Sequence, residues 1–319
     1  AGAFVSGESS ALMSAIEGRV GEPRPKYVHT SEKGIWGKPS CLNNVETWAT
    51  VPHIINKGAE WFCSMGTEGS KGTKIFSLVG KVKNTGLVEV PMGITLRDII
   101  FKIGGGVPNG KSFKAVQTGG PLGGCIPASG LNLQVDFDAL KEAGAVMGSG
   151  GMIVVDEDTC MVEFSKFFLT FATAESCGKC VPCRLGIDRM LEIITDITEG
   201  RGNPGHIPLL EDLGETMSLA SLCGLGKTAA NPVLTTLRYF RDEYDEHIRD
   251  KKCSAGVCQA LITYSIDPDK CTFCGMCRLA CPHNAVIGGK KKLHSIDVNL
   301  CRKCGICRSE CKFDAVRVI

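Results

Sequence analysis

The chain has 319 residues, of which 43% are hydrophobic and 22% charged, and its formal net charge is +2. This length allows two or three domains with hydrophobic cores. The near-neutral charge gives no indication of nucleic-acid binding, no apolar stretch approaches the ~20 residues of a membrane helix, and no signal peptide is recognisable.

The first half of the chain predicts loops followed by a small β-rich domain over residues 69–150. The segment "TKIFSLVGKV" alternates like a strand, "KNTGLVEV" supplies a turn and a return strand, and "FKAVQTGG" is another strand. Between them, "TLRDIIFKI" predicts a helix with Thr95 as its N-cap, three residues before Asp98. A strand pair, a helix and a strand are typical of a β-grasp fold.

Residues 151–245 change to a helical period and predict a four-helix bundle. The first helix has a stripe of phenylalanines at the i, i+3, i+4, i+7 spacing, which predicts a buried face: Phe164, Phe167, Phe168 and Phe171. The segment "IPLLEDLGETMSLASL" predicts a third helix. Asn231 is the predicted cap of a fourth, with Pro232 at the first helical position.

Eighteen cysteines are too many for an ordinary domain, and eleven of them form three C-x₂-C-x₂-C runs with two followers. Disulfide frameworks occur mainly in small secreted proteins and need no such spacing. Iron–sulfur clusters do need it, because short steps let neighbouring thiolates surround one cube. The pattern therefore predicts metal ligation in a reducing, cytoplasmic setting. Three cysteines outside the runs are predicted to be free buried thiols: Cys41, Cys63 and Cys125.

Residues 266–319 contain an internal repeat, whose two copies begin at Asp267 and Asp297. The copies are "DPDKCTFCGMCRLACPHNAV" and "DVNLCRKCGICRSECKFDAV". In two-cluster ferredoxins, the fourth Cys of each run ligates the cluster of the other run; zinc sites, the alternative, usually have longer gaps between paired ligands. The repeat therefore predicts a ferredoxin domain with two [4Fe–4S] clusters. One is held by Cys271, Cys274, Cys277 and Cys311, the other by Cys301, Cys304, Cys307 and Cys281.

A further cysteine run lies between the first two predicted helices, in "ESCGKCVPCRLG". It supplies Cys177, Cys180 and Cys183, one ligand short of a [4Fe–4S] cluster. Cys223, in "SLCGLG", lies where the third helix ends, and Gly224 after it permits a tight turn. An antiparallel bundle can bring that end back to the first loop, so Cys223 is the predicted fourth ligand.

The connector at 246–265 carries a separate candidate site. His247, Cys253 and Cys258 have the short spacing of a structural zinc site, and Cys160 is the candidate fourth ligand. Two other interpretations stay open: one more iron–sulfur cluster, or a surface histidine with two idle thiols. The histidines near the ferredoxin cysteines are predicted to be surface residues without a metal role: His283 and His294.

The motifs together resemble a known family. "ESCGKCVPCRLG" followed by "SLCGLG", and the stretches "GAFVSGESSALMSAIEGRVGEPRPK" and "GIWGKPSCLNNVETWATV", resemble the NADH-oxidising flavoprotein subunit of respiratory complex I over residues 1–245. The ferredoxin tail and "KKCSAGVCQALITYSID" are instead similar to the equivalent subunit of cytoplasmic NAD(P)-linked [FeFe]-hydrogenases, including the electron-bifurcating ones. The resemblance implies that residues 1–68 are the C-terminal part of an FMN/NADH-binding domain and that the β-grasp domain is SLBB-like.

The resemblance also implies a set of cofactor-binding residues. Gly7 and Glu8 match residues beside the flavin, Asn43 and Asn44 match an Asn pair that contacts FMN, and Lys26 matches a Lys near the NADH pocket. Amide side chains can hydrogen-bond a ribityl or phosphate group, and a Lys can neutralise a phosphate. FMN and NAD(H) are therefore the implied cofactors of the full-length subunit.

Several positions depart from the family pattern. Phe4 stands where relatives often have Tyr, Ser9 where they have a second Glu, and His29 where they have Phe. The upstream phosphate-binding glycine loop is not in these residues, and "GGPLGG" at 119–124 has no following helix that would make it one. We therefore expect a piece of a longer subunit that does not bind FMN by itself.

The resemblance implies an α+β multidomain electron-transfer subunit that connects NAD(P)H and FMN to iron–sulfur clusters. The implied partners are a catalytic hydrogenase subunit and a small [2Fe–2S] thioredoxin-like subunit, with ferredoxin as a further candidate. Two alternatives stay open: the flavoprotein subunit of an NAD-linked formate dehydrogenase, built from the same parts, and a non-catalytic iron–sulfur carrier or scaffold. The choice between NAD and NADP is also open.

Overall fold

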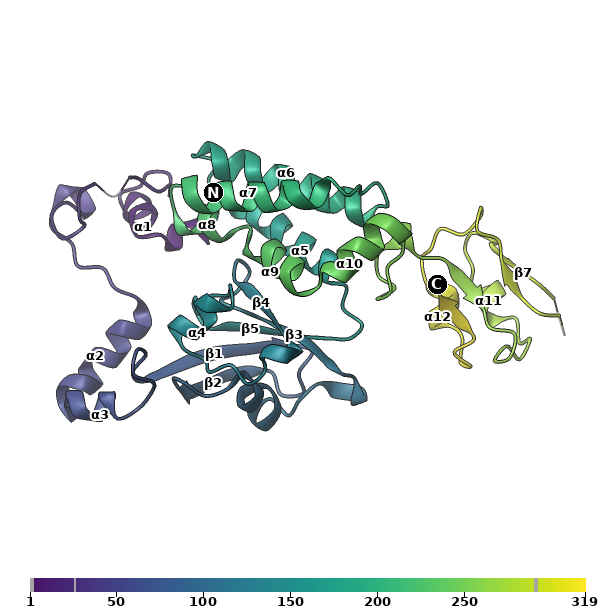
Figure 1. The fold of residues 1–319 in the computed structure, drawn as a ribbon, viewed down its shortest axis with the longest axis horizontal. Helices are drawn as coiled ribbons and strands as arrows, with labels where there is room; N and C mark the ends of the chain where they lie inside the picture. The colour runs from purple at the N-terminus through teal and green to yellow at the C-terminus, as the bar shows by residue number, and fades with distance from the viewer. Residues whose placement is uncertain (1–2, 26, 290–291) are drawn as a thin grey trace. The chain divides into compact units, whose positions relative to one another are not determined.

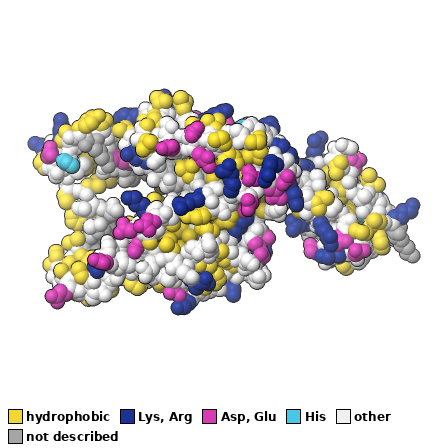
Figure 2. Space-filling model, viewed as in Figure 1, with side chains coloured by type: hydrophobic (Ala, Val, Ile, Leu, Met, Phe, Trp, Pro, Cys, Tyr) yellow, Lys and Arg dark blue, Asp and Glu magenta, His cyan; other side chains and the backbone are white. Residues whose placement is uncertain are grey.

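The computed structural model describes residues 3–25, 27–289 and 292–319. They form two compact units, the first made of residues up to 195 together with 205–241, the second of 196–204 and 242–319 (Figure 1). Among the described residues, none of the helices has both the length and the apolar character needed to cross a membrane. On the face shown in Figure 2, basic and acidic side chains are interspersed, in keeping with the near-neutral net charge.

The first unit contains a five-stranded mixed sheet with the strand order β2-β1-β5-β3-β4. The strands are β1 (Thr73–Gly80), β2 (Gly86–Pro91), β3 (Phe113–Thr118), β4 (Gly124–Pro127) and β5 (Gly151–Asp156). β1 and β5 are parallel, whereas the other neighbours are antiparallel. The central strand β5 lies beyond the predicted domain boundary at residue 150, so the sheet extends to Asp156.

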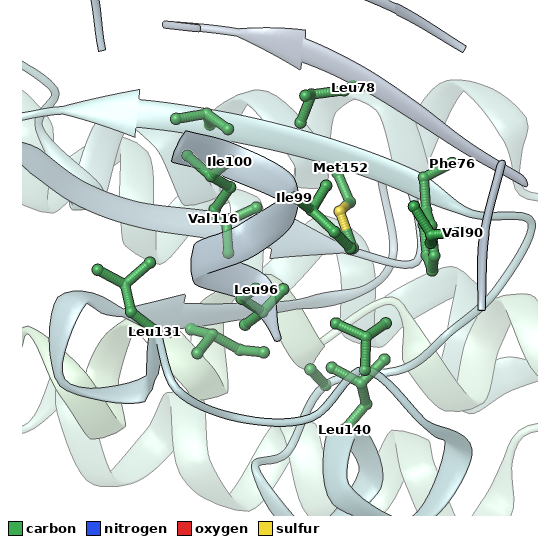
Figure 3. Packing of buried hydrophobic residues seen from close by; sticks show 14 of the residues in the cluster. Phe76, Leu78, Val90, Leu96, Ile99, Ile100, Val116, Leu131, Leu140 and Met152 are labelled. Atoms are coloured by element: carbon green, nitrogen blue, oxygen red, sulfur yellow. The ribbon is translucent and has the colours of Figure 1, made fainter. Parts of the chain in front are cut away.

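The predicted helix after β2 forms, but as a wide π-helix, η3 (Asp98–Ile103). Thr95 Oγ1 accepts a hydrogen bond from the amide of Asp98 at 3.1 Å, as the capping pattern predicts. The amide of Gly104, at the end of the helix, donates to the carbonyl of Ile99. This bond spans five residues, as in a π-helix, instead of the four of an α-helix. The helix packs on one face of the sheet, and Ile99 and Ile100 are fully buried there (Figure 3).

The first unit also contains the short helix α4 and several 3₁₀-helices. Helix α4 (Phe137–Glu142) begins at Asp136, whose carboxylate accepts the amide of Ala139 at 2.7 Å, and Leu140 is fully buried. The 3₁₀-helices are single turns: η1 (Val5–Gly7), η2 (Ile35–Gly37), η4 (Pro108–Gly110), η5 (Ala128–Gly130) and, in the second unit, η7 (Gln259–Leu261).

Helices follow the sheet in the chain: α5 (Met161–Glu175), α6 (Val181–Thr198), α7 (His206–Ala220), α8 (Gly224–Thr228), α9 (Asn231–Tyr239) and α10 (Arg241–Asp245). The phenylalanine stripe on α5 is only partly buried. Phe168 is 2% exposed and Phe164 packs against the sheet, but Phe167 is 68% exposed, so its predicted burial is wrong. Phe167 lies about 100° around the helix from Phe168, at the edge of the stripe.

The segment before β1 forms three short helices: α1 (Ser9–Ile16), α2 (Val45–Lys57) and α3 (Ala59–Cys63). The α1 segment is attached to α5, because the amide of Phe4 donates to the carboxylate of Glu175 at 3.1 Å and the rings of Phe4 and Phe171 meet edge to face. The α2 segment is attached to β1 through an ion pair between Glu46 and Lys74. α2 has no buried residue. Cys41 and Cys63, which lie before and after α2, are exposed, so their predicted burial is wrong, whereas Cys125 is buried as predicted.

The second unit includes the π-helix η6 (Glu246–Asp250), which precedes the connector and the internal repeat. Its elements are β6 (Tyr264–Ile266), α11 (Met276–Leu279), β7 (Val286–Ile287), β8 (Ser295–Ile296), α12 (Ile306–Ser309) and β9 (Val316–Val318). The first strand of each half pairs with the last strand of the other half, β6 with β9 and β8 with β7. Gly275 and Gly305, at matching positions of the repeat, both adopt positive φ (77° and 79°) before their helices. The two halves are therefore copies of one structure with exchanged strands.

Candidate iron–sulfur and metal centres

The four cysteines predicted for the first cluster converge at one end of the helices. Cys177 and Cys180 lie in the loop before α6, Cys183 lies in its first turn, and Cys223 immediately precedes α8. Cys183 is 4% exposed, and burial raises the pKa of its thiol to about 11, with further contributions from the charges of the other three cysteines. Burial likewise raises the pKa of Cys223. Four sulfur donors that influence one another in this way fit a [4Fe–4S] cluster.

A glycine makes this convergence sterically feasible, but it is not the predicted one. An ideal Cβ on Gly226 would lie 3.0 Å from Cys183 Cβ and 2.6 Å from Ser221 Oγ. The backbone of α8 therefore approaches the α6 turn as closely as only a glycine allows. Gly224, which the sequence marks as the turn residue, has open space where a side chain would be and no positive φ.

In the second unit, each predicted set of ferredoxin cysteines lines one cavity. The first cavity is lined by Cys271, Cys274 and Cys277 of the first run and by Cys311 of the second. The second cavity is lined by Cys301, Cys304 and Cys307 and by Cys281 of the first run. Each cavity thus draws three cysteines from one half and one from the other. This donor chemistry and arrangement fit one [4Fe–4S] cluster per cavity.

Backbone amides point at the two follower cysteines in the same way. The amide of Ala285 donates to Cys281 Sγ, and the amide of Ala315 donates to Cys311 Sγ, each at 3.3 Å. Although burial acts to raise the pKa of Cys281, the amides of residues 283–286 outweigh it and hold that pKa below its usual range. The third cysteine of each run has a shift in the opposite direction. Burial raises the pKa of Cys277, and it raises the pKa of Cys307 to about 11.

His294 lies inside the first cavity, which corrects its predicted place at the surface. The residue is only 2% exposed, and it lines the cavity together with the cysteines. Its Nδ1 is buried and has no hydrogen-bond partner among the described residues. His283, in contrast, is exposed as the sequence predicts. The internal repeat could have indicated that His294 lies beside a cavity. Its matching residue in the other copy is Tyr264, which lines the second cavity.

Three of the four connector ligands lie together in the second unit. His247, Cys253 and Cys258 are 1–3% exposed, and their ligand atoms lie within 4.8 Å of one another. His247 Nδ1 lies 2.7 Å from the carbonyl oxygen of Glu243, and Nε2 lies 3.4 Å from Cys258 Sγ. If Nδ1 donates to that carbonyl, Nε2 is the unprotonated nitrogen that a metal binds, which is the usual arrangement for a ligating histidine. Cys160, the predicted fourth ligand, precedes α5 in the first unit, where its Sγ accepts the amide of Glu163 at 3.5 Å.

The residues predicted to contact flavin and NADH lie on two separate segments. Gly7 ends the turn before α1, and the Glu8 carboxylate caps α1 by accepting the amides of Ser10 and Ala11 at 2.9 and 3.0 Å. Asn44 precedes α2, and Asn43 Nδ2 lies 3.5 Å from Cys41 Sγ. Lys26 lies outside the described residues.

Comparison with family models identifies three regions of the chain. Residues 163–247 match the NADH-ubiquinone oxidoreductase-F iron-sulfur binding region, residues 264–287 match a 4Fe-4S binding domain, and residues 75–125 match the SLBB domain. The first match contains the cysteines at the start of α6 and α8, and the third covers most of the mixed sheet.

Several characterised proteins are similar to the chain over most of its length. The NADP-reducing hydrogenase subunit HndC of Solidesulfovibrio fructosivorans is 52% identical over 92% of this chain and 60% of its own length. The F 2 subunit of the NADH-quinone oxidoreductase of Rhizobium meliloti is 39% identical over 79% of this chain and 60% of its own length. In a solved structure of an NAD⁺-reducing [NiFe]-hydrogenase, one chain superposes with a TM-score of 0.72 at 34% identity, over 78% of this chain and 42% of that one. The present chain thus spans less than two thirds of the length of each of these relatives.

Proposed function

We propose that this chain passes electrons between NAD(P)H, FMN and three [4Fe–4S] clusters within a hydrogenase complex. Its residues 163–247 match the iron–sulfur binding region of the NADH-ubiquinone oxidoreductase F family. The observation that carries this proposal is the grouping of twelve cysteines into three sets of four, together with the 52% identity to a hydrogenase subunit.

Each cluster, when bound, would accept and release one electron at a time. The chain's own residues would set how easily that happens. Four thiolates would hold each cluster, apolar side chains such as Ile266 and Val316 line the first ferredoxin cavity, and amides such as that of Ala285 place a positive dipole end on a ligating sulfur. Hydrogen bonds to sulfur and exclusion of solvent are the main means by which a protein sets a cluster's potential.

The FMN and NADH contacts belong to the same proposal. Gly7, Glu8, Asn43, Asn44 and Lys26 would line part of the flavin and nicotinamide site of the full-length subunit. The family match downstream of these residues supports the assignment. In the structure both Glu8 oxygens accept hydrogen bonds, one from the amides of Ser10 and Ala11 and the other from the Ser9 hydroxyl at 3.1 Å.

A hydrogenase complex is favoured over the formate dehydrogenase alternative by the relatives, which include an NADP-reducing hydrogenase subunit and a chain of an NAD⁺-reducing hydrogenase. A catalytic hydrogenase subunit and a small [2Fe–2S] thioredoxin-like subunit would complete the complex in the cytoplasm. The full complex, purified by a tag on this subunit, should couple NAD(P)H to hydrogen rather than to formate. Formate-dependent NAD(P)⁺ reduction without hydrogen uptake would reverse the assignment.

Electron bifurcation is a narrower proposal within this function. The flavin would have two outlets, the cluster at Cys177 and those of the ferredoxin domain. The test is whether hydrogen formation by the complex requires NAD(P)H and reduced ferredoxin together. Equal rates with NAD(P)H alone would show that the second outlet is not used in this way.

We also propose a structural zinc ion at His247, Cys253 and Cys258, with Cys160 as the fourth ligand. The burial of the three connector ligands and the Glu243 carbonyl beside His247 Nδ1 support it. A fourth iron–sulfur cluster at this place is less consistent with a histidine ligand.

The decisive experiment is the metal and flavin content of the anaerobically purified full-length subunit, by plasma mass spectrometry, sulfide assay and absorbance. Three cubes and the zinc site predict about 12 Fe and about one Zn per chain. About 16 Fe without zinc would place a further cluster in the connector. Retained NAD(P)H-to-viologen activity would reject a scaffold role, whereas absent flavin and absent activity in the full-length subunit would support it.

A further inference from the structure

The two ferredoxin cavities are alike in their cysteines but differ in other side chains of their linings. The first has Phe313 and Thr272 where the second has His283 and Arg302, both exposed, and the difference in a buried side chain is at a further repeat position. Tyr264 and His294 occupy the same position in the internal repeat, each where the strand that precedes its half's cysteine run begins. Because the halves exchange strands, Tyr264 lines the cavity of Cys301, and His294 lines the cavity of Cys271. The repeat thus places a phenol beside one cluster site and an imidazole beside the other.

The imidazole is held in a fixed position by the backbone around it. An ideal Cβ on Gly288 would lie 2.6 Å from His294 Cδ2, so only a glycine leaves room for the ring there. On the other side, His294 Nε2 lies 3.8 Å from the place of a Cβ on Gly275, in the middle of the first cysteine run. The ring is therefore packed closely against Gly288 and reaches toward the loop that carries Cys274.

The ring also needs a hydrogen-bond acceptor. A neutral imidazole carries one N–H, and buried N–H groups are nearly always paired. His294 is 2% exposed and its Nδ1 has no partner among the described residues. The other residues that line this cavity are mainly apolar, apart from the cysteines. The sulfur atoms of a cluster would be the acceptors within reach.

Resting on the function proposed above, we propose that His294 donates a ring N–H hydrogen bond to the cluster held by Cys271, Cys274, Cys277 and Cys311, and thereby gives it a more positive potential than its twin. Reduction adds one electron and one negative charge to the cluster, and a hydrogen-bond donor at its sulfur stabilises that added charge.

The twin site has a side chain of a different kind at this place. Tyr264 is only partly buried, so its hydroxyl has access to water, and it reaches to 3.0 Å from the place of a Cβ on Gly305. Arg302 also lines the second cavity and its charge favours reduction there, but its side chain is exposed and water screens that charge. An electron that enters the ferredoxin domain would therefore reside mainly on the cluster beside the buried His294.

The test is an EPR-monitored redox titration of the full-length subunit and of three variants. His294→Phe removes the donor, His294→Gln keeps an N–H, and Tyr264→Phe is the matched control at the twin position. We expect His294→Phe to shift the equilibrium between the two ferredoxin clusters about tenfold, which is about 59 mV for one electron. The shift should affect one cluster and be smaller in His294→Gln, and Tyr264→Phe should leave that cluster unchanged.

A second measurement tests the proposal even if the His294→Phe variant fails to assemble its clusters. In the unsubstituted subunit labelled with ¹⁵N-histidine, pulsed EPR should detect ¹⁵N coupling to one reduced ferredoxin-domain cluster. Absence of that coupling, or unchanged potentials in a fully loaded His294→Phe variant, would overturn the role of His294 while leaving the clusters in place. An unsubstituted subunit with only about 4 Fe would instead overturn the ferredoxin clusters themselves.

Discussion

The hydroxyl oxygen of Thr235 on α9 accepts a hydrogen bond from the backbone amide of Cys125 on β4, 2.9 Å away and 110 residues earlier in the chain. Both residues are buried. The same hydroxyl donates to the carbonyl of Asn231 at 2.7 Å, so it satisfies a strand amide that points at a helix. This bond joins the sheet of the SLBB region to the helices that carry the first cysteine set.

Replacing Thr235 with Val should remove the buried hydroxyl that accepts the Cys125 amide. We expect the free energy of unfolding to fall by about 0.5–1.5 kcal/mol, the usual net contribution of one hydrogen bond. Urea denaturation of preparations with equal iron content measures it. Thr235→Ser keeps the hydroxyl and is the control. A loss in the Ser variant with none in the Val variant would mean that the methyl group, and not the hydrogen bond, matters at this junction.

Two neighbouring glycines provide a matched pair for the first cluster. Gly226→Ala places a methyl group against Cys183 and Ser221, whereas Gly224→Ala places one in open space. The first variant should lose about 4 of about 12 Fe, since α8 can no longer approach α6. The second should retain all of its iron. Iron analysis by plasma mass spectrometry decides between them, and full iron in both variants would contradict the close approach.

The exchange of ligands between the ferredoxin halves predicts non-additive iron loss. Cys281 and Cys301 line one cavity, so the double variant Cys281→Ala/Cys301→Ala should lose no more iron than either single one, about 4 Fe. Cys281→Ala combined with Cys271→Ala affects both cavities and should lose about 8 Fe. The opposite pattern of losses would show that each run binds its cluster alone.

Thiol reactivity in the iron-free chain should depend on pH in a residue-specific way. The thiolate is the reactive form. Burial raises the pKa of Cys183 and of Cys307 to about 11, whereas backbone amides, against the raising effect of burial, keep that of Cys281 low. At about pH 8, iodoacetamide should therefore label Cys281 first, and the other two should accelerate as the pH rises toward about 11. Peptide mass spectrometry follows the labelling, and the difference should vanish in urea. Labelling in the reverse order in the folded chain would show that access outweighs thiolate population.

Local spacing predicted much of this molecule, and the reason is chemical. Cysteines three residues apart can face one point whatever surrounds them, and in the second unit the cysteines of each predicted ferredoxin set line one cavity. The same holds for the Thr95 cap and for β1, whose buried residues alternate. Such features depend on a few neighbouring residues.

The features that the sequence did not reveal depend on distant parts of the chain. β5 carries the run "GMIVVD", which lacks alternation because both of its faces are covered, and its residues lie within the region predicted to be helical. Phe167 belongs to a regular helical stripe, yet only packing decides how wide the buried face is. His294 is buried because the other half of the repeat encloses it. In each case burial was set by a partner segment far away in sequence.

The exchanged strands also affect the order in which this unit can fold during synthesis. β6 precedes all eight ferredoxin cysteines, but its partner β9 is reached only at Val316–Val318. The first cavity likewise waits for Cys311. A nascent chain that has emerged as far as Cys281 therefore presents open thiols and an unpaired strand edge. Cluster insertion into this unit is expected to follow release of the complete repeat from the ribosome, rather than to proceed one half at a time.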